Sequence, residues 1–135
     1  MKKAAFSLKE YMFDKVKIDF AKKTSNELDI DFNPYGVFKA NESVFELKFV
    51  FNAHNGNIEN SFVEIQCIAN FKFEDNITFE EIPSYFFRNS IAILFPYVRA
   101  FISTVTLQAN ISPVILPTMN LSELEKPLKE NTRQE

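Results

Sequence analysis

The sequence predicts an α+β fold, in which a four-stranded antiparallel, Greek-key-type sheet is packed by one long kinked helix and a short C-terminal helix. Apolar and polar residues alternate along much of the segment from residue 6 to residue 74, as in strands with one buried face. The segment from residue 84 to residue 107 is nearly all apolar, and its only charged side chains are Arg88 and Arg99. Such a helix must be buried on more than one side. The length predicts a single domain over residues 1–135.

The first two strands follow from this alternation. In the first strand the apolar positions are Phe6, Leu8, Val16, Ile18 and Phe20. Their phase shifts near Met12-Phe13, which predicts a bulge or kink. In the second strand Leu28, Ile30 and Phe32 alternate with acidic residues. The Asn33-Pro34 pair is expected to end that strand.

The third and fourth strands are expected on either side of Asn55-Gly56, a dipeptide typical of a tight hairpin turn. Each strand places its apolar residues on one face and its polar residues on the other. The sheet is therefore expected to have one dry face and one wet face. The expected inward residues are Phe45, Leu47, Phe49, Phe51, Val63, Ile65, Cys67, Ala69, Phe71 and Phe73.

The long helix is expected over residues 84–107, with Ser84 as its N-cap. Pro96 lies inside this helix and should kink it. Two prolines, Pro113 and Pro117, exclude a helix from the apolar loop that spans residues 108–120. A short helix is expected at about residues 121–128, and the tail after it is expected to be frayed.

The long helix is also expected to contact a second subunit. Arg88 and Arg99 are eleven residues apart, which at about 100° per residue brings them to nearly the same side of the helix. The rest of the circumference is apolar, and a chain of this length can cover only one side of it with its own sheet. The interface candidates are Ile91, Ile93, Leu94, Val98, Phe101, Ile102 and Val105.

Residues that could perform bond chemistry are scarce, so an enzyme is not expected. His54 is the only histidine and is interpreted as a solvated residue beside the turn rather than a catalytic base. Cys67, the only cysteine, is expected to be a buried, inert thiol. Asp29 and Asp31 share one strand face, where solvated acids are commoner than a hydrolytic pair. One His and one Cys are too few for a zinc site, and no metal or other cofactor is expected.

Charge and composition narrow the partners and the compartment. The formal charge of −3 argues against nucleic-acid partners, which need clustered cations. Lys2 and Lys3 precede Ala4-Ala5-Phe6, which charged residues rather than a longer apolar stretch follow, so no signal peptide is expected. The longest uncharged apolar run, residues 89–98, is far shorter than the roughly 20 residues that span a bilayer. A single cysteine agrees with a reducing compartment, so we expect a cytoplasmic protein without direct membrane insertion.

Four segments resemble a known family. These are LFPYVR at residues 94–99, SPVILPTMNL at residues 112–121, EIQ at residues 64–66 and ELDIDF at residues 27–32. They are similar to the LFPYAR signature, the FPPLLLAPINF run, the EVQ-type tripeptide and the EVKLDL-type second strand of SecB, the bacterial protein-export chaperone. The resemblance runs from about residue 6 to about residue 124, and its most specific part is the block 94–121.

The resemblance implies an ATP-independent holding chaperone, assembled as a homotetramer that is a dimer of dimers. In that family, grooves between the sheet, the loop and the second helix hold extended segments of unfolded preproteins and keep them translocation-competent. Residue types alone favour the simpler interpretation, in which the apolar loop only seals the core. Carried over by position, the client-binding residues are Leu28, Ile30, Phe32, Ile111, Val114, Ile115, Leu116, Met119, Leu121 and Leu124.

The resemblance further implies delivery of the client to the translocase motor SecA, through an acidic sheet face and the C-terminal tail. The candidate acids are Asp29, Asp31, Glu46 and Glu64, which can equally be solvated strand residues. Two features depart from the family: Ile68-Ala69 replaces a glycine-rich step, and the tail has mixed charge. These departures keep open a SecB-like chaperone dedicated to one client, such as an antitoxin.

A protein of another class is also open. An oligomeric scaffold or a small-ligand-binding module could use the same apolar groove for one lipid or aromatic molecule. A closed pocket of roughly a few hundred cubic ångströms would favour that class, whereas an open groove that continues across subunits would favour the chaperone. An enzyme comes third, because it requires a buried carboxylate or His54 in a cleft.

Overall fold

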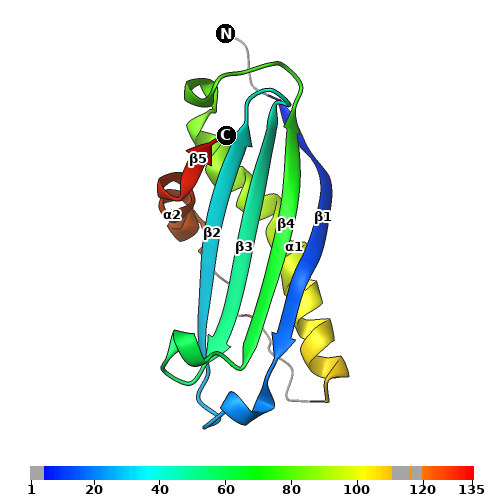
Figure 1. Cartoon of the computed structure of the whole chain (residues 1–135), viewed down its shortest axis with the longest axis vertical. Coiled ribbons are helices and arrows are strands. Elements are labelled where there is room, and N and C mark those ends of the chain that lie inside the picture. Colours follow the sequence, from blue (N-terminus) through cyan, green and yellow to red (C-terminus); the bar gives the residue numbers. More distant parts are fainter. Residues whose placement is uncertain (1–4, 111–115, 117–119) are drawn as a thin grey trace.

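The computed structural model describes residues 5–110, 116 and 120–135. A β-sheet carries a long helix on one face and shorter elements at one edge (Figure 1). The elements in chain order are β1 (Phe6–Ile18), η1 (Phe20–Lys22), β2 (Asp29–Lys39), β3 (Val44–His54), η2 (Ile58–Asn60), β4 (Val63–Phe73), η3 (Phe79–Glu81), α1 (Ser84–Gln108), η4 (Leu121–Leu124), α2 (Glu125–Glu130) and β5 (Thr132–Gln134).

The strands form a five-stranded sheet in the order β1-β4-β3-β2-β5. The pairs β1–β4, β4–β3 and β3–β2 are antiparallel, and β1 lies beside β4 as in a Greek key. β5 pairs with β2 in parallel. The sheet is therefore mixed, and the expectation of a four-stranded antiparallel sheet is wrong because of this added strand.

The C-terminal tail, which was expected to be frayed, contributes the end of α2 and all of β5. Gly36 of β2 donates its backbone N–H to the carbonyl of Asn131 at 3.2 Å, and Glu135 donates to the carbonyl of Phe38 at 2.9 Å. The side-chain amide of Asn131 donates to the carbonyl of Pro34 at 3.2 Å. The tail has no apolar alternation of its own, so its strand depends on the backbone edge that β2 offers.

β2 continues through Asn33-Pro34, where the sequence predicted its end. Gly36 directs its N–H away from β3, toward Asn131. Pro34 lies two residues earlier, so its nitrogen faces the same outer edge of the sheet. A proline at this position removes no hydrogen bond from the β2–β3 ladder, and the strand tolerates it.

β3 and β4 have the inward faces that the sequence predicted, and all ten expected residues are at most 2% exposed. Their connection differs from the expected two-residue turn. β3 ends at His54, β4 begins at Val63, and η2 lies between them. Gly56 has φ of 106°, which favours glycine, but within this longer loop.

β1 has register shifts between Leu8 and Glu10 and between Phe13 and Lys15. The second shift confirms the bulge expected near Met12-Phe13. The apolar residues after this bulge are not buried as expected. Val16 is 45% exposed, and Phe20 is 57% exposed and lies in η1 rather than in the strand. The end of β1 therefore presents apolar side chains at the surface.

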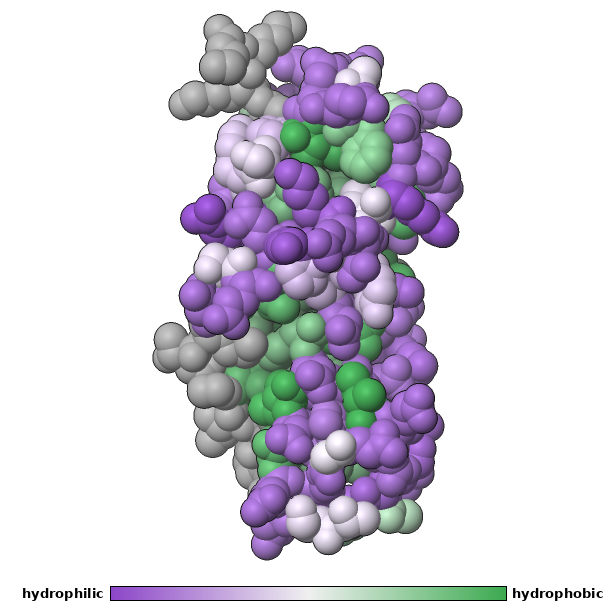
Figure 2. All heavy atoms as spheres, turned by 90° about the vertical axis from the view of Figure 1, so that its left-hand side faces the viewer, coloured by the Kyte–Doolittle hydropathy of each residue, from purple (hydrophilic) through white to green (hydrophobic). Residues whose placement is uncertain are grey.

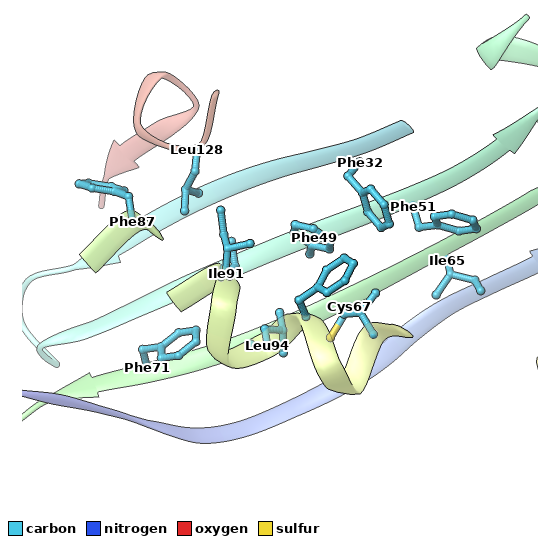
Figure 3. Packing of buried hydrophobic residues seen from close by; sticks show 14 of the residues in the cluster. Phe32, Phe49, Phe51, Ile65, Cys67, Phe71, Phe87, Ile91, Leu94 and Leu128 are labelled. Carbon is cyan, nitrogen blue, oxygen red and sulfur yellow. The ribbon is translucent and has the colours of Figure 1, made fainter. Parts of the chain in front are cut away.

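α1 is one helix that crosses a face of the sheet diagonally, with Pro96 inside it (Figure 1). Pro83 is its N-cap, so Ser84 is the first helical residue rather than the expected cap. Phe86 packs between strands, with ring centroids 4.7 Å from those of Phe6 and Phe45. The buried helix residues, several of which are drawn in Figure 3, are Phe86, Phe87, Ser90, Ile91, Leu94, Phe95, Val98, Ile102 and Thr106.

By length and apolar composition alone, the 25 residues of α1 would qualify as a membrane span, although the core helix of a soluble protein passes the same test. In this fold one stripe of α1 is buried against the chain's own sheet. That packing is the one expected of a core helix.

Candidate functional site

The N-terminal end of β2 carries apolar side chains that the sequence assigned to a client-binding groove. Leu28 is 40% exposed, and Ile30 is half-buried against the core. Phe32 is only 9% exposed, with its ring centroid 5.2 Å from that of Phe49 and 5.6 Å from that of Phe95. Leu28 and Ile30 therefore offer accessible apolar surface, whereas most of Phe32 belongs to the core.

The segment after α1 places further apolar residues against α1 and β2. Leu121 and Leu124 of η4 are half-buried against the core, and η4 contacts both α1 and β2. Leu116 is 4% exposed and belongs to the core itself. Figure 2 faces the β2 side of the molecule and shows apolar atoms gathered in its lower half. The remaining groove candidates lie outside the described residues; they are Ile111, Val114, Ile115 and Met119.

The backbone of β2 has an outer edge that is only partly occupied. Gly36 and Phe38 direct their backbone groups to this edge, where they bond to Asn131 and Glu135. Ile30 and Phe32 have the same parity in the strand, so their N–H and C=O groups point the same way. Within the described part of the chain, no hydrogen bond occupies those groups of Ile30 and Phe32. An extended chain could therefore pair with β2 there.

The helix residues expected at a subunit interface divide into two groups. Ile93 is 40% exposed, and Phe101 and Val105 are half-buried. The other four pack within the chain's own core at no more than 1% exposure; they are Ile91, Leu94, Val98 and Ile102. The sequence identified an apolar circumference but could not say which side of it the sheet covers.

Other exposed apolar residues were missed by the sequence analysis. Tyr97 and Leu107 are 45% and 58% exposed on α1, and Met12 is 58% exposed on β1. Tyr97 follows Ile93 by four residues, so the two are neighbours on one helix face. The four-residue spacing is visible in the sequence. It identifies an exposed pair only when the helix face that the sheet leaves uncovered is known.

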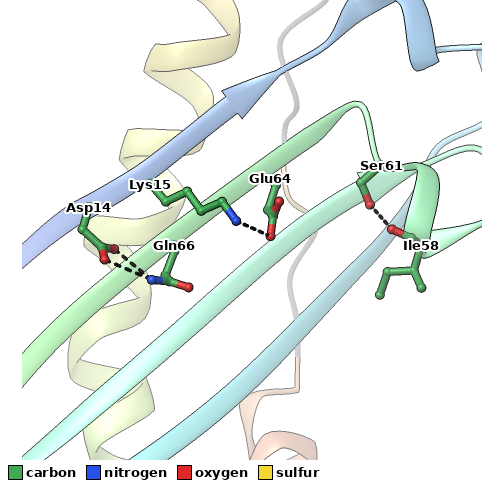
Figure 4. A network of polar contacts seen from close by, with 6 residues as sticks. All are labelled: Asp14, Lys15, Ile58, Ser61, Glu64 and Gln66. Atoms are coloured by element: carbon green, nitrogen blue, oxygen red, sulfur yellow. Dashed lines mark hydrogen bonds and ion pairs between the residues drawn. The ribbon is translucent and has the colours of Figure 1, made fainter.

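The acidic residues expected on the outer face of the sheet are largely paired. Glu64 lies 3.4 Å from Lys15 Nζ, next to the Asp14–Gln66 hydrogen bonds (Figure 4). Glu46 lies 3.3 Å from Lys39 Nζ, and this bond to Glu46 raises the pKa of Lys39. Of the four candidate acids, Asp29 has no ion pair among the described residues.

His54 is not the solvated turn residue that the sequence predicted. It is the last residue of β3 and 7% exposed, and its Nε2 lies 2.6 Å from Oδ2 of Asp31. Gly56 donates its backbone N–H to Nδ1 at 3.1 Å. Because Nδ1 accepts, Nε2 carries the ring proton and donates a hydrogen bond to Asp31. Nε2 thus links the end of β3 to the start of β2, and Nδ1 holds the loop that follows β3.

Cys67 is buried at 1% exposure, as the sequence predicted. Burial is the main cause that raises the pKa of its thiol to about 12, and the charge of Asp14 adds to it. The thiol is therefore protonated and unreactive at neutral pH. Among the described residues, no group of three or more His, Cys, Asp or Glu side chains could hold a metal ion.

Among solved structures, the chain is similar to the Mycobacterium tuberculosis Rv1957 SecB-like chaperone in complex with a ChAD peptide from the Rv1956 HigA1 antitoxin. The likeness covers 85% of this chain and 88% of that chain, with a TM-score of 0.64 and 18% sequence identity. The fold is SecB-like. The sequence resemblance to SecB is thus confirmed at the level of the fold, and this structural neighbour is a chaperone rather than an enzyme.

Two further likenesses accompany the SecB-like fold. A segment of 51 residues is 55% identical to the uncharacterised protein MJ0357 of Methanocaldococcus jannaschii, covering 35% of this chain and 33% of that protein. The chain therefore spans about a third of the length of the curated relative that it matches. A protein of unknown function from Streptococcus agalactiae matches 87% of this chain and 100% of its own, with 14% identity and a TM-score of 0.41. No protein-family model matches the sequence.

Proposed function

We propose that the chain is a SecB-like holding chaperone that binds one dedicated unfolded client at the edge of β2. The observation that carries this proposal is the accessible apolar surface of Leu28 and Ile30, next to open backbone groups of β2. The antitoxin peptide in the complex of the SecB-like neighbour supports a client of this kind. Such a client would be a segment of another protein that is kept unfolded until its partner is available.

Binding follows from ordinary physical chemistry. An unfolded client exposes apolar side chains, and burying them against Leu28, Ile30, Leu121 and Leu124 contributes on the order of 25 cal/mol per Å². Its backbone can pair with the open groups of Ile30 and Phe32, as β5 pairs with the same edge farther along. Folded proteins hide both kinds of group, so the site selects unfolded chains. Holding of this kind needs no ATP.

The proposal includes assembly with further copies of the chain. Ile93, Tyr97 and Leu107 are exposed on α1, and burying them against a second copy would remove apolar surface from water. A dimer of dimers would place several client sites on one particle, so that a long client could bind several weak sites at once. Cytoplasmic location belongs to the same proposal.

Delivery of the client to SecA stays a prediction from the sequence resemblance. Glu46, Glu64 and Asp31 are engaged with Lys39, Lys15 and His54. Lysines already offset the charge of two of the four candidate acids, Glu46 and Glu64, so the face would attract a basic partner less strongly. The dedicated client is therefore the form of the chaperone that we favour.

Calorimetric titration tests the proposed function directly. The titrant is a small disulfide protein held unfolded by reduction and carboxymethylation, compared with the same protein in its folded state. Binding of the unfolded form alone, with a negative heat-capacity change from apolar burial, is the expected result. Equal affinity for both forms, or no binding to either, would remove the chaperone proposal.

A further inference from the structure

A cavity of about 270 Å³ opens on the outer face of the sheet, where β5 joins β2. The strand register explains which side chains meet there. Arg133 is paired with Val37, and Lys48 is paired with Tyr35, so all four lie on the face opposite α1. Gly36 and Asn131 also line the cavity. The cavity therefore lies on the other side of the sheet from the core.

Among the described residues, two cations of this cavity have no carboxylate partner. The Lys48 ammonium lies over the Tyr35 ring, 5.1 Å from its centroid. The ring helps to position the ammonium but does not neutralise its positive charge. Arg133 forms no ion pair within the described part of the chain. Glu46 also lines the cavity, but its carboxylate lies 3.3 Å from Lys39. The cavity therefore carries an excess of positive charge in a chain whose net charge is −3.

Hydrogen bonds from the C-terminal tail to β2 hold the walls of the cavity in place. Asn131 accepts a hydrogen bond from Gly36 through its carbonyl and donates one to Pro34 through its side chain. These bonds place Arg133 next to β2. Because the N–H of Gly36 is already used, the cavity offers side-chain donors rather than the cluster of free backbone N–H groups typical of phosphate sites.

We propose that this cavity binds a carboxylate of a partner polypeptide, between the guanidinium of Arg133 and the ammonium of Lys48. A guanidinium presents parallel N–H donors that match the two oxygens of a carboxylate, and the ammonium supplies a second positive charge. The volume suits one side chain or one chain terminus rather than a larger ligand. Tyr35 and Val37 supply apolar walls for the carbon atoms that carry the carboxylate.

The proposal is independent of the client site at the edge of β2, because it concerns the opposite face of the sheet. The carboxylate can come from an aspartate or glutamate side chain or from the C-terminus of the partner. The two sources share their chemistry and are separated by the peptides used in the test.

Fluorescence anisotropy of labelled peptides with the full chain tests the proposal. The probes are a short glutamate-containing peptide with an amidated C-terminus, its glutamine counterpart, and the glutamine peptide with a free C-terminus. Binding of the first identifies a side-chain carboxylate, and binding of the third alone identifies a chain terminus. Equal binding of all three peptides, or binding of none, would overturn the proposal.

Three variants connect the binding to the cavity. Arg133→Gln and Lys48→Gln are each expected to weaken binding about tenfold, which is the loss typical of one charge-assisted hydrogen bond. Lys17→Gln removes the same charge from β1, on the far edge of the sheet, and is expected to leave binding unchanged. An equal loss in the Lys17 variant would mean non-specific charge attraction and would refute the site.

Reversing the charge at Lys48 distinguishes a loss of peptide recognition from a loss of folding. Lys48→Glu lies on β3, away from the bonds that hold β5, and is expected to abolish binding of the glutamate peptide. The same variant should bind a lysine-containing peptide with an amidated C-terminus more tightly than the wild type does. Loss of the glutamate peptide without any gain for the lysine peptide, in a variant with wild-type urea unfolding, would count against direct contact at Lys48.

Discussion

Phe13 of β1 and Phe101 of α1 stack with ring centroids 3.8 Å apart and planes 6° from parallel. One helical turn earlier, Tyr11 stacks on Tyr97 with centroids 4.8 Å apart. These contacts hold the edge strand β1 against the free side of the long helix. Strand and helix therefore form one surface, on which exposed Ile93 also lies, one helical turn before Tyr97.

The first prediction concerns assembly through that surface. Ile93→Asp would place a carboxylate in the proposed subunit contact, where an unpaired charge is costly. The dissociation constant of the assembly is expected to rise about a hundredfold or more. Light scattering over a dilution series measures it. Ile58→Asp is the matched control, because Ile58 is 44% exposed on η2 and Ile93 is 40% exposed. A monomeric wild type would rule out the proposed interface.

The second prediction concerns the client site. Leu28 is 40% exposed, so Leu28→Asp is expected to change the free energy of unfolding by less than about 0.5 kcal/mol. Client affinity is expected to fall about tenfold, because the carboxylate opposes burial of the client there. Titration calorimetry and urea unfolding measure the two effects. Unchanged affinity in the folded variant would exclude Leu28 from the site.

The third prediction concerns backbone pairing at Ile30 and Phe32. A client peptide that is N-methylated at every second residue loses N–H groups along one edge only. One of the two alternate patterns is expected to weaken binding by up to about tenfold per bond lost, and the other pattern is expected to have little effect. Equal effects of both patterns, with the unmethylated peptide still bound, would mean that side chains alone hold the client.

The fourth prediction concerns the attachment of β5. A Cβ atom at Gly36 would lie 2.3 Å from Cζ of Phe45 and 2.6 Å from Oγ1 of Thr132. Gly36→Val should therefore displace β5, lower the free energy of unfolding by about 1–3 kcal/mol, and speed tryptic cleavage after Arg133.

Gly56→Ala provides the control for that experiment. Gly56 has φ of +106°, and no atom of the described residues lies within 4 Å of the position that a Cβ would take there. Its substitution therefore strains the backbone without touching β5. This variant is expected to be less stable but to be cleaved after Arg133 at the wild-type rate. Equal cleavage of both variants would show that general destabilisation, rather than release of β5, exposes the tail.

The fifth prediction concerns Cys67 and alkaline pH. Its thiol has a pKa of about 12 in the folded chain against an ordinary value of 9.0. Above pH 9 the unfolded chain loses this proton and the folded chain keeps it, so stability should fall by up to about 1.4 kcal/mol per pH unit until about pH 12. Urea unfolding at pH 8 to 10 measures this slope, and Cys67→Ala should reduce it. A thiol that reacts with a disulfide reagent at neutral pH before unfolding would contradict its burial.

Much of the fold was predictable because it depends on local patterns. The alternation through Phe45–Phe51 and Val63–Phe73 specifies which strand face is buried, whatever lies against it. Pro34 misled the prediction, because a proline ends a strand only when its nitrogen faces a paired neighbour. His54 misled it as well, since a histidine beside a turn signal is usually solvated, and only the approach of Asp31 at 2.6 Å makes it a structural residue.

The candidate site was less predictable than the fold. Leu28 and Phe32 have the same parity in the sequence, yet one is 40% exposed and the other 9%. Their difference depends on the packing of Phe49 and Phe95 around Phe32. The same holds for Ile91 and Ile93 on the helix, because the sheet covers only one of them.

The sequence by itself determined the buried faces of β3 and β4, the long apolar helix and the scarcity of catalytic groups, because each of these follows from residue type and spacing along the chain. Tertiary structure alone decided that the tail becomes β5, which apolar residues stay exposed, and that Arg133 and Lys48 share a cavity. Those features depend on contacts between residues far apart in sequence. The free energy of pairing a strand edge or burying a helix face depends on which segment packs against it.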